Sequence, residues 1–176
     1  RSCHPGVGLR HDQFLAEASS NESGGSSMTE QDESPARVLV LNGPNLSRLG
    51  KREPDIYGAM NYDQLVEFCT TIGADMNLDV EVRQTDSESE LIGWIHEAVD
   101  SSTPVVLNPA AFTHYSYALR DACAQRTATL IEVHLSNPAA REEFRHTSVI
   151  SAVADGTIAG FGPRSYALAL TAIAAL

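Results

Sequence analysis

Short apolar runs alternate with longer amphipathic stretches from Arg37 to the end of the chain, and this alternation restricts the fold more than any other feature. Short continuous apolar runs are typical of strands buried on both faces, whereas apolar residues spaced three and four apart indicate helices. The predicted strands are residues 38–41, 78–83, 104–107, 129–133 and 157–160. The predicted helices are residues 61–77, a helix after a Ser87–Glu90 capping box, residues 115–123, a short helix at 138–144, and residues 164–176.

Strands that alternate with helices form parallel sheets covered on both faces. The pattern therefore predicts an α/β fold, namely a flavodoxin-like, doubly wound, five-stranded parallel sheet in a three-layer α/β/α arrangement. We expect this catalytic domain to span residues 37–176. Residues 1–36 are rich in Ser, Glu and Gly, so we predict a disordered acidic leader, in which Met28 is a candidate natural start.

The charge balance restricts the partners. Twelve basic residues stand against 23 acidic ones, for a net charge of −11, which argues against binding to nucleic acid or to anionic membranes. No apolar run is long enough to span a membrane, and the N-terminus lacks an apolar signal core. With three cysteines and no CxxC motif, the composition predicts a cytoplasmic protein with reduced thiols.

Polar side chains follow three of the predicted strands directly. Asn42 and Asn45 come after the first strand, Asn108 after the third, and His134 and Ser136 after the fourth. Because the carboxyl ends of parallel strands meet at one edge of the sheet, we expect these groups to converge on a ligand site. For Asn42 and also Asn137 we favour turn chemistry, since Asn tolerates left-handed backbone and caps helices.

A long Gly- and Pro-containing loop at residues 43–60 carries Arg48, Lys51, Arg52 and Tyr57. Loops of this length in compact domains are often functional lids. A tyrosine with an ordinary pKa near 10 is a poor base at neutral pH, but a nearby cation favours the phenolate. The alternative is a solvated loop that carries charge for solubility. We interpret Tyr57 as a general base whose pKa Arg52 lowers.

Glu132 and His134 are two residues apart in a strand, so both side chains point to the same side of the sheet. A carboxylate beside a histidine fixes its tautomer and raises its pKa, which suits His134 to act as a general acid. Together with His114 the pair is also a conceivable metal site. We disfavour a metal, because the three residues lack the HxxxH spacing that places two ligands on one helix face.

Arg141 and Arg145 are four residues apart, which would place them on one face of the short helix predicted after His134. They either pair with Glu142 or Glu143, or reach the site and bind substrate oxygens. The backbone N–H groups of Leu135 and Ser136 are candidate carboxylate donors.

Seven segments in this order resemble the type II 3-dehydroquinate dehydratases: LNGPNLSRLG, REPDIYG, RQTDSESELIGWIHEA, LNPAAFTHYS, ALRDA, IEVHLSN and REEFR. The resemblance runs from about Val38 to the C-terminus. It implies reversible anti elimination of water from 3-dehydroquinate to 3-dehydroshikimate through an enolate, with a dodecamer built from trimers. It leaves open a role in biosynthesis of aromatic amino acids through the shikimate pathway or in quinate breakdown.

The resemblance also implies roles for individual residues. Tyr57 is the base for the C2 proton and Arg52 tunes it, Asn45 holds a water beside the enolate oxygen, and His134, oriented by Glu132, protonates the departing C1 hydroxyl. The implied substrate-binding residues are Asn108, His114, Leu135, Ser136, Arg145, Arg141 and Asp121, the last of which reaches the site of a neighbouring subunit. The chain has no GxGxxG, Walker or nucleophile-elbow motif, so we predict no cofactor and no metal.

Two other functions are consistent with parts of the pattern. A Schiff-base dehydratase would need a lysine in the site, and Lys51, the only lysine in the chain, would have to serve. A flavodoxin-like binding module without chemistry would keep the fold but would not need Arg52, Tyr57 and His134 together.

Overall fold

The computed structural model describes residues 34–51 and 60–176 of the chain. The predicted strands are present as β1 (Ala36–Asn42), β2 (Leu78–Gln84), β3 (Val105–Asn108), β4 (Leu130–His134) and β5 (Gly156–Ala159). The α-helices are α2 (Tyr62–Asp75), α3 (Glu88–Asp100), α4 (Tyr117–Cys123) and α5 (Arg164–Ala174). Most of the predicted leader lies outside the described residues, and β1 begins at its last residue, Ala36.

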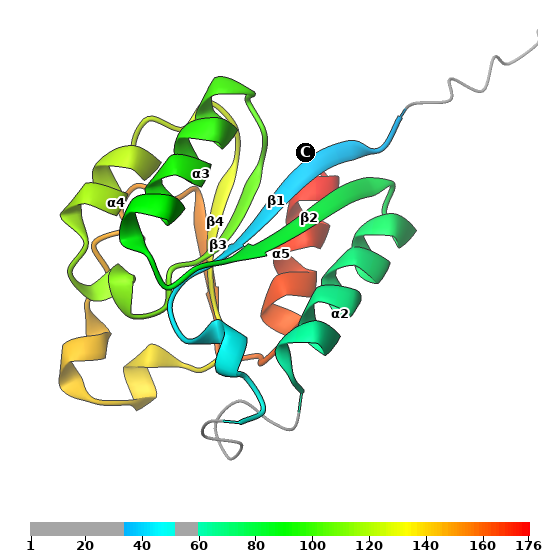
Figure 1. The fold of residues 1–176 in the computed structure, drawn as a ribbon. Helices are drawn as coiled ribbons and strands as arrows, with labels where there is room; N and C mark the ends of the chain where they lie inside the picture. The colour runs from blue at the N-terminus through cyan, green and yellow to red at the C-terminus, as the bar shows by residue number, and fades with distance from the viewer. Residues whose placement is uncertain (1–33, 52–59) are drawn as a thin grey trace, which may run out of the picture. The chain divides into compact units, whose positions relative to one another are not determined.

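All five strands are parallel and lie in the order β2-β1-β3-β4-β5 (Figure 1). This is the strand order of the flavodoxin-like fold, and it confirms the predicted fold class. The order reverses between β1 and β3, where Asn42 and Asn108 are register partners at the strand ends. In open α/β sheets, ligands bind outside the carboxyl ends of the strands at such a point. The topology therefore directs attention to the loops that follow β1, β3 and β4.

Helices cover both faces of the sheet, with α2 and α5 on one face and α3 and α4 on the other (Figure 1). Alternate residues of β1 supply the two apolar cores, because successive side chains of a strand point to opposite faces. Val38 and Val40 pack on the α2–α5 side, and Leu39 and Leu41 on the α3–α4 side. All four are fully buried, which is why the first strand reads as a continuous apolar run.

Local hydrogen bonds fix where the helices begin. A complete capping box opens α2, since the Asn61 side chain accepts from the Gln64 backbone N–H and the Gln64 side chain accepts from the Asn61 N–H. At α3 the expected capping box is only half formed. Ser87 accepts from the Glu90 N–H, but the Glu90 carboxylate bonds the Thr85 hydroxyl, and that hydroxyl accepts from the Ser87 N–H.

The prediction of one helix at residues 138–144 was wrong. Two short 3-10 helices occupy this region, η3 (Pro138–Ala140) and η4 (Glu143–His146), with extended backbone at Arg141 and Glu142 between them. Asn137 caps η3 through a hydrogen bond to the Ala139 N–H, which is the turn role expected of it. No helix among the described residues is long and apolar enough to cross a bilayer.

Candidate active site

A cavity of about 160 Å³ opens at the carboxyl ends of β1, β3 and β4. Its walls are the loops that follow these strands, as the topology predicts. It is lined by Pro44, Asn45, Leu46, Arg48, Leu49, Asn108, Ala110, Ala111, His114, His134, Leu135, Ser136, Pro138, Arg141 and Arg145. Eight residues that the sequence singled out are therefore brought together around one space: Asn45, Asn108, His114, His134, Leu135, Ser136, Arg141 and Arg145.

The loop after β1 is held against the ends of its neighbours. Gly43 donates its N–H to the Asn108 carbonyl at 2.8 Å, and a Cβ at Gly43 would lie 2.5 Å from the Pro109 carbonyl oxygen, so only glycine fits. Asn45 has left-handed backbone, with φ at 68°, and its N–H bonds the Asp86 carboxylate at 2.8 Å. These contacts fix the backbone of Asn45 at the cavity wall, with its side chain exposed.

Asn108 and Asn42 are joined through one buried phenol. The Asn108 amide donates to the Tyr166 hydroxyl at 2.8 Å, and that hydroxyl donates to the Asn42 amide oxygen at 2.6 Å. Burial raises the pKa of Tyr166 well above its ordinary value, so the phenol stays protonated and keeps both bonds. The Asn108 oxygen accepts from the Ala110 N–H, which leaves the second N–H of its amide for a ligand.

The turn role expected of Asn42 was wrong, because Asn42 ends β1 without left-handed backbone. Its side chain is fully buried, and besides the Tyr166 bond it donates to the Arg83 carbonyl at 3.2 Å, so it braces β1 against β2 and α5. Left-handed backbone occurs at Asn45 and Ala110, which line the cavity, and also at Asn77 and Ser102, which do not. Strained backbone of this kind is often found at functional sites.

His114 is the last residue of the 3-10 helix η2 (Ala110–His114), just before the start of the helix predicted at residues 115–123. Its Nδ1 lies 2.8 Å from the Thr147 carbonyl oxygen, and a carbonyl only accepts, so Nδ1 carries the proton. In the neutral ring Nε2 is then an acceptor. His114 therefore offers the cavity an acceptor suited to a substrate hydroxyl.

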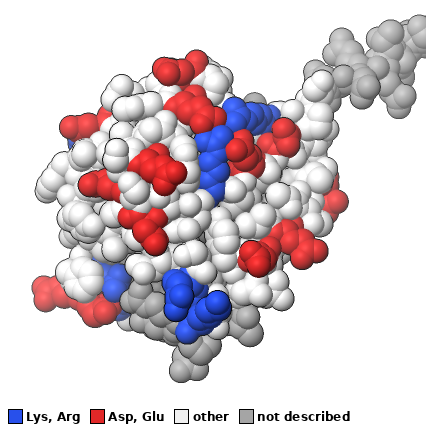
Figure 2. Space-filling model, viewed as in Figure 1, with Lys and Arg blue, Asp and Glu red and all other residues white. Residues whose placement is uncertain are grey.

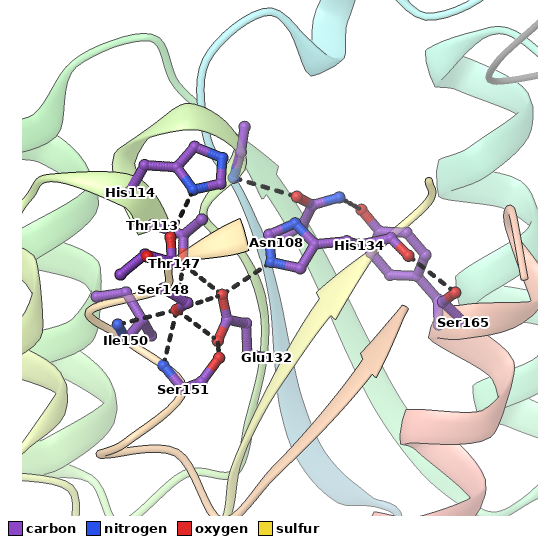
Figure 3. Close-up of polar contacts among 12 residues, drawn as sticks. Asn108, Thr113, His114, Glu132, His134, Thr147, Ser148, Ile150, Ser151 and Ser165 are labelled. Carbon is purple, nitrogen blue, oxygen red and sulfur yellow. Dashed lines mark hydrogen bonds and ion pairs between the residues drawn. The ribbon is translucent and has the colours of Figure 1, made fainter. Parts of the chain in front are cut away.

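Glu132 and His134 form a buried pair at the end of β4 (Figure 3). His134 Nε2 lies 2.8 Å from Glu132 Oε1, and the Glu132 side chain is fully buried. Burial by itself raises the pKa of Glu132, but hydrogen bonds from His134, Ser151 and Thr113 outweigh it and bring that pKa below its usual range. Since Nε2 faces Glu132, the imidazole presents Nδ1 for exchange with a ligand.

The segment after β4 supplies the remaining lining groups. Leu135 is buried in the core, so only its backbone can serve a ligand, while Ser136 is half-buried beside Arg141, whose Nη1 lies 3.3 Å from the Ser136 hydroxyl. Arg145 bonds Glu142 at 2.7 Å, and Arg141 approaches the same carboxylate at 3.7 Å. The expected shared helix face is absent, because Arg141 precedes η4. Both arginines nevertheless line the cavity while they pair with Glu142.

Charge around the cavity is opposite in sign to that of the chain. Of the described residues that line it, Arg48, Arg141 and Arg145 are basic and none is acidic. Figure 2 shows acidic side chains over much of one face, with one group of basic side chains in its upper middle and another near the lower edge, toward the carboxyl ends of the strands in Figure 1. A concave site lined by one sign of charge raises the local concentration of an oppositely charged ligand. The arrangement suits a small anion with hydroxyl groups.

Four predicted site residues are not among the described residues that line the cavity. Arg52 and Tyr57 lie outside the described residues. Asp121 lies on α4, with its side chain 73% exposed and paired to Arg120 at 3.0 Å. Glu132 lies behind His134 and does not line the cavity.

The described residues contain no group of three His, Cys, Asp or Glu side chains arranged to hold a metal ion. His114 directs Nδ1 to a backbone carbonyl, and Glu132 is engaged by His134 and by hydroxyl groups. The contacts within the conceivable Glu132–His134–His114 set are therefore those of a hydrogen-bonded acid–base pair with a separate histidine.

Sequence reasoning missed several residues that support the site. Tyr166 lies on a helix whose apolar face is otherwise aliphatic, and Asp86, Thr113, Ser148 and Ser151 are ordinary loop residues by type. Nothing in their local pattern marks them, because their partners are up to 124 positions away in the chain. A Glu within a largely apolar strand, as in LIEVH, is the available signal, since a buried carboxylate requires donors.

Comparisons of the sequence with known proteins all point to one family. A family model described as Dehydroquinase class II matches residues 36–174. A protein named 3-dehydroquinate dehydratase from Salinispora tropica is 60% identical over 139 residues, which are 79% of this chain and 97% of that protein. One of the same name from Mycobacteroides abscessus is 58% identical over 133 residues, 76% of this chain and 92% of the relative.

Solved structures agree with these sequence matches. The crystal structure of a type II dehydroquinase from Propionibacterium acnes is similar with a TM-score of 0.79 and 58% identity, covering 80% of this chain and 97% of that one. A type II dehydroquinase from Butyrivibrio crossotus gives a TM-score of 0.77 at 45% identity, over 80% of this chain and 98% of that one.

Proposed function

The chain belongs to the class II dehydroquinase family, and from this premise we propose that it is a hydro-lyase that converts 3-dehydroquinate to 3-dehydroshikimate reversibly. The observation that carries the proposal is the Glu132–His134 pair, because it presents a buried imidazole to a cavity whose described charged residues are all basic. Elimination beside a ketone needs a base, an enolate stabiliser and an acid, and this pair supplies the acid.

The proposed reaction proceeds in two steps. Tyr57 as phenolate removes the C2 proton, and the electrons of that C–H bond form an enolate with the C3 carbonyl. Arg52 favours the phenolate, and a water held by Asn45 stabilises the enolate oxygen. The enolate then collapses, the C1–O bond breaks, and His134 donates a proton so that the hydroxyl leaves as water. The proton on Tyr57 returns to solvent and His134 is reprotonated.

Substrate binding is assigned to groups that surround the cavity. Arg141 and Arg145, with the backbone N–H groups of Leu135 and Ser136, suit the carboxylate, since arginine binds carboxylates with matched donor geometry. The remaining Asn108 N–H and His114 Nε2 suit the ring hydroxyls. The product would serve biosynthesis of aromatic amino acids through the shikimate pathway, with quinate breakdown as the alternative setting.

We also propose a homo-oligomer, a dodecamer of trimers, in which Asp121 reaches a neighbouring subunit's site. Its exposure and its absence from the described cavity lining of its own chain support this assignment. Large apolar side chains exposed near the site, including Tyr115, Tyr117 and Phe144, are consistent with contacts between copies. Light scattering of the purified protein measures the assembly directly, and a monomer would contradict this part of the proposal.

The test of function is the ultraviolet absorbance of the conjugated enone that forms when purified protein meets 3-dehydroquinate without added metal or cofactor. We expect a rise that saturates with substrate. No rise would favour a binding module without chemistry. Covalent inactivation by borohydride in the presence of substrate, mapped to Lys51, would instead indicate a Schiff-base mechanism.

A further inference from the structure

Three hydroxyl groups from outside β4 surround the carboxylate of Glu132 (Figure 3). Thr113 and Ser151 each donate a short hydrogen bond, to Oε1 and Oε2 respectively, and the Ser148 hydroxyl lies 3.2 Å from both oxygens. Glu132 lies on the same face of the sheet as Leu130, and Leu130 packs in the apolar core on the α3–α4 side. A carboxylate thus occupies a core position and is surrounded by donors.

The direction of these bonds follows from the backbone. Ser148 accepts from the N–H groups of Ile150 and Ser151, at 3.0 and 2.9 Å, so both its lone pairs are occupied. Its oxygen therefore cannot accept from Thr113, although the two oxygens are 2.6 Å apart. The Thr113 proton must go to Glu132, and the Ser148 hydroxyl donates to the Thr113 oxygen at 2.6 Å. The loop backbone thereby orients Thr113 and Ser151 as donors to Glu132, with Ser148 as the donor to Thr113.

Two titratable groups face the carboxylate from the surrounding elements. His134 lies beside it on β4, and the Cys123 thiol approaches from α4. Burial, with a further contribution from the Glu132 charge, raises the pKa of Cys123 to about 12, so the thiol is neutral. Among the described residues no arginine or lysine pairs with Glu132.

One proton shared by a buried carboxylate and an imidazole can reside on either partner. A low-dielectric surrounding favours the uncharged pair, with the proton on the carboxylate, whereas donors to the carboxylate favour the ionised pair. At Glu132 the donors outweigh burial. The hydroxyls that donate to Glu132 therefore influence whether His134 enters the reaction as an imidazolium or as a neutral imidazole.

We propose that Thr113 and Ser151, with Ser148 holding Thr113, are positioning residues that keep Glu132 ionised. They thereby keep the shared proton on His134 Nε2, so that the imidazolium can give its Nδ1 proton to the departing hydroxyl. The inference rests on the proposed function for its kinetic consequence, but the protonation state of Glu132 is measurable without turnover. None of the three hydroxyls contacts substrate in this scheme.

The two segments that supply these hydroxyls, η2 and the loop at residues 147–151, also hold the proposed substrate-binding histidine, His114. Thr113 precedes His114, whose Nδ1 bonds the Thr147 carbonyl next to Ser148, and the Val149 N–H donates to the Thr113 carbonyl at 2.8 Å. The donors around Glu132 and the acceptor offered by His114 are therefore set by one interlocked pair of segments.

The first test is infrared spectroscopy of the intact protein over a range of pH, with Glu132→Gln used to assign the band of the protonated Glu132 carboxyl. In the wild type we expect this band only below the ordinary glutamate pKa of 4.5. In Thr113→Val and in Ser151→Ala it should appear at higher pH, since each change removes one donor and leaves two. Thr113→Ser and Ser151→Thr retain the hydroxyl and should restore the wild-type behaviour.

The second test is steady-state kinetics on 3-dehydroquinate. We expect kcat of Thr113→Val and Ser151→Ala to fall by roughly tenfold with KM little changed, because the acid is affected and the binding groups are not. Ser101→Ala, which removes an exposed hydroxyl bonded to the Glu97 carbonyl, is the matched control and should match the wild type.

The outcomes separate the two proposals. An unchanged Glu132 band in both variants would overturn the positioning role, whatever the activity. A wild type without turnover would remove the proposed function, and the infrared result would still decide whether the hydroxyls hold the charge on Glu132. Equal loss of activity in Ser151→Ala and Ser151→Thr, with an unchanged band, would mean that Ser151 only supports local packing.

Discussion

The Tyr166 hydroxyl accepts a 2.8 Å hydrogen bond from the Asn108 amide and thereby ties α5 to the carboxyl end of β3. The same oxygen donates to Asn42 at the end of β1, so one phenol spans the point where the strand order reverses. This buried contact orients the Asn108 amide toward the cavity.

Tyr166→Phe should destabilise the protein and weaken substrate binding. It removes the partner of one Asn108 N–H and of the Asn42 amide oxygen, and loss of a partner costs about 1–3 kcal/mol for a buried polar group. Because Asn108 is assigned to binding, KM should rise more than kcat falls. Urea unfolding and steady-state kinetics measure both effects. Tyr117→Phe, at an exposed tyrosine, is the control, and equal stability of the two variants would contradict the bracing role.

Tyr57→Phe and His134→Ala should each lower turnover at least about 10²-fold, the low end for removal of a general acid or base. Tyr62 and Tyr166 cannot replace Tyr57, since burial raises the pKa of both and opposes the phenolate. The enone absorbance assay measures the loss, and circular dichroism verifies the fold. Near-normal turnover of Tyr57→Phe would exclude the tyrosine as the base.

Gly43→Ala and Gly93→Ala should have effects of opposite sign on stability. A Cβ at Gly43 would lie 2.5 Å from the Pro109 carbonyl oxygen, and such overpacking costs about 1–3 kcal/mol. A Cβ at Gly93, in α3, meets nothing within 4 Å, and alanine there should add about 0.5–1 kcal/mol. Denaturant unfolding tests both, and a neutral Gly43→Ala would show that the loop after β1 moves freely.

The sequence predicted the flavodoxin-like parallel sheet and the edge of that sheet at which the site forms. Both follow from local periodicity and from the residue after each strand. It also predicted that Glu132 and His134 share a face, since strand alternation requires it. It did not predict the break between Arg141 and Glu143, where the chain leaves helical geometry. Tyr166 and Ser151 could not be found, because their roles depend on tertiary contacts and not on local pattern.

The acid stability of the fold should depend on Glu132, with a sign fixed by its lowered pKa. The folded-state pKa lies below the ordinary 4.5, so the stabilisation is fully present above that value and is lost as the pH falls through the lower folded-state value. Glu132→Gln cannot ionise and lacks this contribution. The difference in unfolding free energy between wild type and Glu132→Gln should therefore be constant near neutral pH and shrink below pH 4.5.

Urea unfolding at a series of pH values measures this difference, and other carboxylates with lowered pKa values, such as Glu97 and Asp155, cancel because both proteins carry them. Glu67→Gln, at an exposed carboxylate of α2, makes the same substitution and the same change of charge and is the matched control. A difference for Glu132→Gln that stays constant into acid would mean that Glu132 is already protonated in the folded protein. In that case the proton of the pair would reside on the carboxylate, and His134 would enter the reaction as a neutral imidazole.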